Sequence, residues 1–149
     1  MHVEHDELVF SLPGDWRSVP SEDREQLLFE SDELEASVVL SVMRDLSIPF
    51  EKLESSARVF AKARCDAEID ARPPGSVRFQ EPWINLKSAE QIAEVAYSGS
   101  DDTGLTFRFY GVVTRRKVVS VWIASSASNE RRANAIVDDA IRGLRIVIP

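Results

Sequence analysis

The spacing of apolar residues along this chain changes three times, and this limits its fold more than any other feature. Apolar residues alternate with other residues up to about residue 44, and between residues 50 and 61 they recur at every third or fourth position. Alternation returns between residues 77 and 125, and helical spacing returns after residue 128. Alternation is the pattern of a half-buried strand, and a spacing of three or four is that of an amphipathic helix. The sequence therefore predicts strands, a helix, more strands and a final helix.

Turn sequences divide the first part of the chain into three predicted strands. Pro13-Gly14-Asp15 ends the first strand, after which Trp16 is expected to fold back onto the core, and Asp32-Glu33 forms a hairpin loop. The following helix is expected to begin near Pro49 and to end before Pro73, because proline cannot continue a helix. The three strands are predicted at residues 8–12, 26–31 and 36–43.

The second part of the chain is divided in the same way. Trp83 to Lys87 is predicted as a loop or a short extension, and Ser98 to Gly104 as a hairpin loop because of its glycines and aspartates. The basic turn Thr114 to Lys117 joins the strands of the most clearly marked hairpin, and Ser128 or Asn129 marks the start of the last helix. The remaining strands are predicted at residues 77–79, 91–97, 105–113 and 118–125.

These elements give the order β-β-β-α-β-β-β-β-α, with no internal repeat and no linker long enough to divide the chain. We therefore predict a single α+β domain over residues 1–149. Its centre would be a twisted antiparallel sheet of about six to seven strands, flanked by two main helices. The content of apolar residues, 44%, is enough for a chain of 149 residues to bury a core of its own.

The net charge of −7 argues against a nucleic-acid surface, because phosphates require a basic footprint. Residues 1–70 contain 17 acidic and 7 basic side chains, whereas residues 71–149 contain 8 acidic and 11 basic ones. The acidic part is interpreted either as a solvated surface that aids solubility or as a surface that steers a basic partner. The cluster Arg115-Arg116-Lys117 is interpreted as a charged hairpin tip.

The sequence contains no apolar run of the about 18 to 20 residues that a membrane helix requires. Its first residues lack the basic and then apolar pattern of a signal peptide. We therefore expect a cytoplasmic protein without membrane insertion. The single cysteine, Cys65, cannot form an internal disulfide, and it is expected to be a small buried or half-buried side chain of the first helix.

The residue pattern matches no template for catalysis or for a metal site. The two histidines, His2 and His5, are expected on an N-terminal tail that frays, so they would not support a Ser/His/Asp or Cys/His apparatus. The same tail is a poor metal site because it lacks a third rigid ligand. Asp138-Asp139 and the pair Glu51 and Glu54 are expected on solvated helix faces. We expect no enzyme activity, no cofactor and no metal.

One face of the sheet is the candidate binding surface, because alternation along the long hairpin separates an inner, apolar face from an outer, mixed one. The residues assigned to the inner face are Leu105, Phe107, Phe109, Val119, Val121 and Ile123. The residues assigned to the outer face are Arg108, Tyr110, Val112, Ser120 and Trp122, with Val39, Ser41 and Met43 from the third strand. The candidate partner-binding set chosen from the outer face is Val39, Met43, Arg108, Tyr110 and Trp122.

Two interpretations of this outer face stay open. In the first, the other helix covers it and the fold has three layers. In the second, the two helices leave part of the face open as a groove lined by Tyr110, Trp122 and Met43. These residue types make anchoring or adaptable contacts with a protein partner.

Several segments resemble the PsbP-like and DcrB-like superfamily, which also contains a eukaryotic Ran-binding import factor. They are the opening Phe10-Ser11-Leu12-Pro13-Gly14-Asp15-Trp16, the strand Ser37-Val38-Val39-Leu40-Ser41, one long helix after a Pro-Phe start, and a final helix followed by an Ile-Val-Ile tail. The resemblance implies an antiparallel sheet flanked by helices and a binding protein without catalytic residues. The superfamily has no diagnostic catalytic motif, so the resemblance transfers no site residue to this chain.

Several soluble bacterial members of that superfamily look like chaperones or adaptors for type VI secretion effectors, with the concave sheet face holding apolar helices of the effector. The resemblance therefore implies a non-catalytic protein-binding domain, with an effector-associated chaperone as the leading hypothesis. One alternative is an immunity protein that neutralises a basic toxin through the acidic surface around Glu33 and Glu35. Another is a small-ligand-binding protein with an enclosed pocket. A homodimer that pairs sheet edges is also compatible with a domain of this kind.

Overall fold

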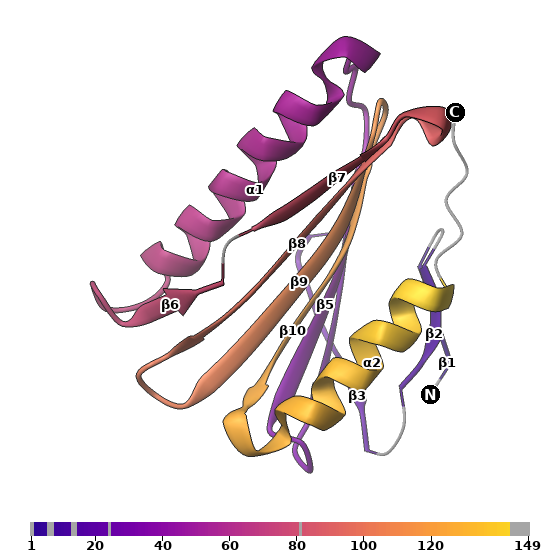
Figure 1. The fold of residues 1–149 in the computed structure, drawn as a ribbon. Coiled ribbons are helices and arrows are strands. Elements are labelled where there is room, and N and C mark those ends of the chain that lie inside the picture. Colours follow the sequence, from indigo (N-terminus) through magenta and orange to yellow (C-terminus); the bar gives the residue numbers. More distant parts are fainter. Residues whose placement is uncertain (1, 6–7, 13–14, 24, 81, 144–149) are drawn as a thin grey trace.

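Two helices lie on opposite faces of one twisted antiparallel sheet (Figure 1). The computed structural model describes residues 2–5, 8–12, 15–23, 25–80 and 82–143. Helix α1 (Leu53–Asp70) covers one face and helix α2 (Glu130–Gly143) covers the other. Both helices carry apolar residues at helical spacing, and the central strands are apolar on both faces, so three layers bury the most apolar surface. The predicted α+β class is confirmed.

The main sheet has eight strands in the order β3-β4-β5-β10-β9-β8-β6, and β7 also pairs with β8. Strand β5, from the acidic part of the chain, pairs with β10 from the last third, so folding interleaves the two differently charged parts. The strands are β3 (Arg17–Val19), β4 (Gln26–Ser31), β5 (Ala36–Met43), β6 (Val77–Phe79), β7 (Trp83–Lys87), β8 (Ile92–Asp101), β9 (Leu105–Thr114) and β10 (Val118–Ser126).

Three local features differ from the sequence-based expectation. The N-terminal histidines, expected on a fraying tail, belong to β1 (His2–His5), which pairs with β2 (Leu8–Ser11) in a separate two-stranded sheet. Residues 83–87 form a strand rather than a loop, because they pair along the outer edge of β8. Strand β8 continues to Asp101, so the predicted hairpin loop shortens to a tight turn.

The face under α2 holds the first of two apolar clusters. Its helix residues are Ala133, Ile136 and Val137, and Trp16 joins it with 5% of its surface exposed, as predicted from the turn before it. The strand residues of this cluster include Val38, Leu40, Val42, Tyr110, Val112, Val119, Val121 and Ile123. These residues alternate along their strands, and therefore point to one side of the sheet.

The face under α1 holds the second cluster, which is rich in aromatic rings. Leu53, Ala57 and Ala61 form the buried stripe of α1, four residues apart, as the spacing predicts. The Tyr97 and Phe109 rings stack below the helix, with centroids 5.1 Å apart and planes at 8°. The rings in contact on this face are those of Phe60, Phe79, Tyr97, Phe107 and Phe109.

Gly99 in β8 leaves space for one of these rings. A Cβ atom at this position would lie 2.6 Å from Cζ of Phe107 and 2.6 Å from the backbone oxygen of Arg78. Both distances are shorter than non-bonded carbon contacts allow, so either the ring or strand β6 would have to move. The absence of a side chain at Gly99 therefore lets the aromatic cluster and the β6 edge approach each other.

Replacing Gly99 with alanine is expected to lower the free energy of unfolding by about 1–3 kcal/mol, the usual cost of an extra methyl group in a packed core. Urea unfolding measures the change. Ser98→Ala is the matched control, because the Ser98 hydroxyl only donates to Gln80 at the surface, and we expect it to cost less than about 0.5 kcal/mol. Equal costs for the two variants would contradict the close approach at Gly99.

Candidate functional site

Helix α1 covers only part of its sheet face, and a groove remains beside it. The helix packs mainly against β7, β8 and β9. Strands β4, β5 and β10 continue the sheet beyond it, and the space between them and the C-terminal half of α1 is a cavity of about 420 Å³. The residues that line it are Gln26, Val39, Ser41, Met43, Phe60, Arg64, Ala67, Glu68, Ala71, Phe109, Val118, Ser120 and Trp122.

The structure brings three of the five predicted partner-binding residues into this groove. Val39 and Trp122 are direct cross-strand partners. Met43 is the partner of Val118, four residues further along each strand. Met43 has 43% of its surface exposed. The open part of the face therefore contains Val39, Met43 and Trp122, and the helix position explains why it is open.

The other two predicted residues, Arg108 and Tyr110, lie on the opposite face, so the prediction that they share a face with Trp122 is wrong. The cross-strand partner of Trp122 is Phe109, not Tyr110. The cause is the turn between β9 and β10, in which two residues, Arg115 and Arg116, separate the last paired positions. With a two-residue turn, odd-numbered residues of β9 share a face with even-numbered residues of β10.

On that opposite face, both residues have partners inside the molecule. Arg108 pairs with Asp138 of α2 at 2.8 Å. The Tyr110 hydroxyl, in the cluster under α2, donates to Glu94 at 2.6 Å. Burial and this hydrogen bond raise the pKa of Tyr110 well above its ordinary value, so the hydroxyl stays a donor. Arg108 and Tyr110 hold the α2 face together, and they do not line the groove.

The wall of the groove formed by α1 contains a buried carboxylate, Glu68, which is 5% exposed. Its Oε2 accepts hydrogen bonds from the Tyr97 hydroxyl at 2.5 Å and from Nε1 of Trp122 at 2.9 Å. Burial and the contact with Glu68 raise the pKa of Tyr97 far above its ordinary value, which keeps the hydroxyl protonated. Because a buried charge needs several partners, this cluster fixes the Trp122 indole against the helix.

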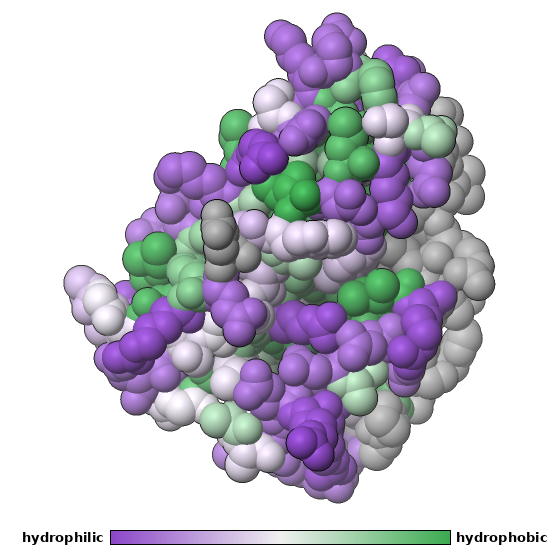
Figure 2. Space-filling model, viewed as in Figure 1, coloured by the Kyte–Doolittle hydropathy of each residue, from purple (hydrophilic) through white to green (hydrophobic). Residues whose placement is uncertain are grey.

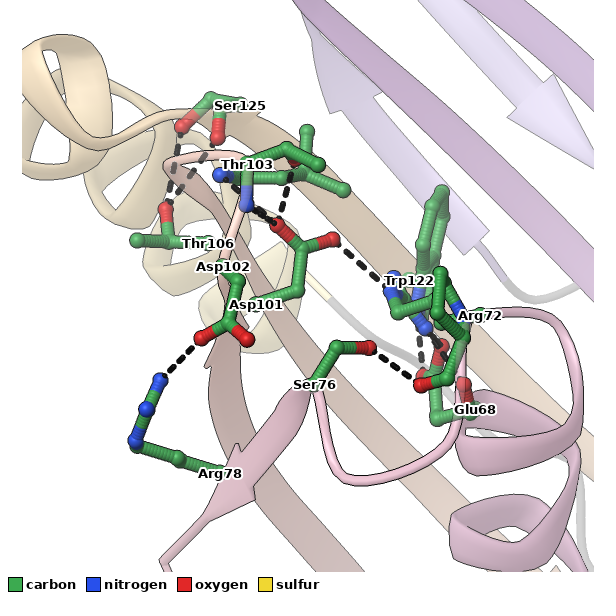
Figure 3. Close-up of polar contacts among 12 residues, drawn as sticks. Glu68, Arg72, Ser76, Arg78, Asp101, Asp102, Thr103, Thr106, Trp122 and Ser125 are labelled. Atoms are coloured by element: carbon green, nitrogen blue, oxygen red, sulfur yellow. Dashed lines mark hydrogen bonds and ion pairs between the residues drawn. The ribbon is translucent and has the colours of Figure 1, made fainter.

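Arg72, just after α1, connects this carboxylate to the turn after β8 (Figure 3). Its Nη1 lies 3.3 Å from Oε1 of Glu68, and its Nε donates to Asp101 at 2.9 Å. Asp101 also accepts from the backbone and the hydroxyl of Thr103 and from the backbone of Leu105. Burial raises the pKa of Asp101, but the hydrogen bonds from Thr103 and Arg72 outweigh it and bring the pKa down to about 2.

The polar groups that remain available in the groove are few. Ser41 and Ser120 are cross-strand partners on its floor, and no side-chain hydrogen bond of either is found within the described residues. Arg64 crosses the Phe109 ring, with its guanidinium carbon 5.1 Å from the ring centroid. The groove thus combines apolar walls with a cation, two hydroxyls and the amide of Gln26, a composition typical of a binding site.

Sequence reasoning missed the residues that α1 contributes to the groove. Phe60, Arg64 and Glu68 lie four residues apart on the helix, and the sequence marks only the apolar Phe60 as facing the sheet. A charged residue one turn after a buried position signals a helix face that borders a polar cavity, but this signal is weak. The sequence alone gives no indication of which strands the helix covers.

A second hollow of about 350 Å³ lies between α1 and the β6–β7 edge, and includes Cys65, Ile69 and Ile84. Cys65 is half-buried, as expected, and burial raises the pKa of its thiol, which keeps the thiol protonated. Figure 2 shows the side of the molecule on which β6 and β7 lie in front, and apolar residues there form separate patches among polar ones.

The described residues contain no group of three or more His, Cys, Asp and Glu side chains that could hold a metal ion. No helix among them has the length and apolar character needed to cross a bilayer.

Replacing Asp101 with asparagine is expected to lower the free energy of unfolding at pH 7 by about 2 kcal/mol. This is the stabilisation that a carboxyl gives when folding lowers its pKa from 3.8 to about 2. A carboxyl whose pKa is lowered by folding stabilises the protein above its unfolded pKa and loses this contribution as the pH falls through the folded pKa. The difference in the free energy of unfolding between wild type and variant should have its full size above about pH 5. It should shrink as the pH falls from about 4 to about 2. Urea unfolding at a series of pH values measures it.

Asp102→Asn is the matched control for this prediction. Asp102 is 55% exposed and, among the described residues, its side chain pairs only with Arg78, itself 70% exposed, so its loss should cost less than about 1 kcal/mol. Equal losses for the two variants, or a loss at Asp101 that does not change with pH, would contradict the role assigned to Asp101.

The whole chain shares its fold with a protein of known structure. No model of a known protein family matches the chain, and no curated protein matches its sequence. Among solved structures, it is similar to cyanobacterial PsbP (CyanoP) from Synechocystis sp. PCC 6803, with a TM-score of 0.63 and 10% identity, over 99% of this chain and 92% of that one. At this level of identity the similarity concerns the fold alone. The expected resemblance is confirmed to that extent, and the chain has a PsbP-like fold.

Proposed function

We propose that this protein is a non-catalytic binding domain that holds an apolar segment of another protein in the groove beside α1. A chaperone or adaptor associated with a type VI secretion effector is the specific form of this proposal. The observation that carries it is the open half of a sheet face, where Met43 and Trp122 border a cavity of about 420 Å³. Aromatic and methionine side chains supply anchoring and adaptable contacts at protein interfaces.

The groove differs from the rest of the sheet in a way that favours a binding role. The large apolar side chains that β5 and β10 direct towards α2, such as Leu40 and Ile123, are at most 2% exposed. Met43 ends β5 at 43% exposure, although it lies on the groove face beside the buried Val118. Leaving apolar surface in water costs about 25 cal/mol per Å², so a partner that covers it would gain that free energy on binding.

The alternative of an immunity protein finds less support in the acidic residues. Glu33 pairs with Arg132 of α2 at 3.1 Å, and Arg17 pairs with both Glu30 and Asp32. These pairs reduce the negative field that a basic toxin would meet around the β4–β5 turn. The salt dependence of binding separates this alternative from the groove, because exposed charges are screened and apolar contacts are not.

Replacing Met43 with aspartate is expected to abolish partner capture without unfolding the protein, because Met43 is at the surface and the new charge would lie in the apolar groove. A pull-down from native lysate, with mass spectrometry of the bound proteins, measures capture. The matched control is Val59→Asp, which places the same charge on an apolar residue of α1 that is 70% exposed and outside the groove. We choose Met43 rather than Trp122 because Trp122 also donates to Glu68.

The proposal expects one partner that is retained by wild type and by Val59→Asp, lost by Met43→Asp, and still captured at high salt, because partly buried contacts are screened much less than exposed charges. Capture that fails at high salt and with Glu33→Gln or Glu35→Gln, but survives Met43→Asp, would support the immunity protein instead. Capture that is the same in all variants would overturn the groove as the site.

A further inference from the structure

We infer that the segment held in the groove carries a carboxylate next to its apolar side chains, and that Arg64 binds this carboxylate. This inference rests on the proposed function. The proposed function makes the partner segment apolar, and the inference gives it a negative charge as well. The starting point is the position of Arg64, in the middle of the α1 wall of the groove, with 35% of its side chain exposed.

The hydrogen-bonding capacity of Arg64 is poorly used inside the molecule. A guanidinium has five N–H donors. Within the described residues, Arg64 makes one side-chain hydrogen bond, from Nη2 to the Tyr97 hydroxyl at 3.3 Å, and its buried Nε has no acceptor. Because Nε itself is buried, an acceptor from outside would meet the Nη groups, of whose four N–H donors one is used within the described residues.

The charge of Arg64 is only partly neutralised inside the molecule, by an ion pair with Glu68 that lacks a hydrogen bond and by the Phe109 ring. The carboxylate nearest to it is that of Glu68, with Oε2 at 3.7 Å from Nη2, beyond hydrogen-bond distance. That same oxygen already accepts from Tyr97 and Trp122, and the other oxygen of Glu68 faces Arg72. Glu68 is therefore satisfied without Arg64, which leaves the Arg64 cation open to a carboxylate from outside.

The surroundings of Arg64 define the occupant more closely. Phe60 lies one turn before it on α1, and Val39 and Trp122 lie across the groove. The floor adds the hydroxyls of Ser41 and Ser120, which can donate to a second oxygen. A segment that fits these groups buries two or three apolar side chains and directs one Asp or Glu side chain, or a C-terminal carboxylate, towards Arg64. The low dielectric of apolar walls strengthens such a charge-assisted pair.

Selection from a phage-displayed library of random 12-residue peptides tests this inference. The selections use wild type, Arg64→Met, which keeps an unbranched stem without the charge, Arg64→Lys, Met43→Asp, which places a charge in the groove, and the control Arg58→Met. Arg58 is on the same helix, 62% exposed and outside the groove. Wild type, Arg58→Met and Arg64→Lys should enrich apolar peptides with an acidic residue at one position or at the C-terminus. Arg64→Met should enrich apolar peptides without that preference.

A synthetic pair of the best peptide, with Glu and with Gln at the enriched position, then gives the size of the effect. Wild type should bind the Gln peptide about tenfold or more weakly, as expected for a lost charge-assisted hydrogen bond, and Arg64→Met should bind both peptides equally. If the peptide ends in the enriched carboxylate, the C-terminal amide replaces the Gln form. Thermal unfolding of each variant confirms that the protein remains folded.

Three results would overturn the inference, and they differ in what they leave standing. Equal affinity of wild type for the Glu and Gln peptides would rule out the contact between Arg64 and a carboxylate, but not the groove as a protein-binding site. If wild type and Met43→Asp enrich the same peptides, the groove is ruled out as the binding site. Dodecanoate added alone could raise the thermal unfolding temperature of wild type more than the selected peptides do, and fail to raise that of Arg64→Met. In that case the occupant is a small apolar anion rather than a protein segment.

Discussion

The position of α1 depends on one buried carboxylate, Glu68. A charge with 5% exposure is tolerated only when hydrogen bonds and an opposite charge replace its water, and here Tyr97, Trp122 and Arg72 do so. Glu68 belongs to the helix, whereas Tyr97 belongs to β8 and Trp122 to β10. The cluster therefore fixes the helix to two strands, β8 and β10, and sets the width of the groove that remains. A hydrophobic contact would not specify this position as narrowly, because it is not directional.

The layers of the fold could be predicted because they follow from local patterns. Alternation over residues 36–43 and 118–125, and the stripe of Leu53, Ala57 and Ala61, indicate strands and a helix whatever the rest of the chain does. The strands at the edges are harder to predict, because β7 has five residues and the turn that joins it to β8, residues 88–91, contains no glycine, proline, asparagine or aspartate. The N-terminal strand β1 has the composition of a polar tail, and its pairing with β2 could not be predicted from that composition.

The candidate site could be predicted only in part. Val39, Met43 and Trp122 were identified from alternation within β5 and β10, which is local information. Arg108 and Tyr110 were misplaced because the relation between β9 and β10 depends on the number of residues in their turn, where the Thr114 hydroxyl accepts from the backbone of Arg116 and Lys117. Arg64 and Glu68 belong to the site through the packing of α1, which no local pattern encodes.

The most direct test of the groove as the binding site is a nuclear magnetic resonance titration of the protein with its captured partner, after labelling of methionine methyl groups and tryptophan indoles. The chain has two methionines and three tryptophans, so few signals need assignment. Partner binding should shift the signals of Met43 and Trp122, and leave those of Trp16, under α2, and Trp83, half-exposed on β7, unchanged. Binding that shifts Trp16 or Trp83 but neither Met43 nor Trp122 would contradict this account.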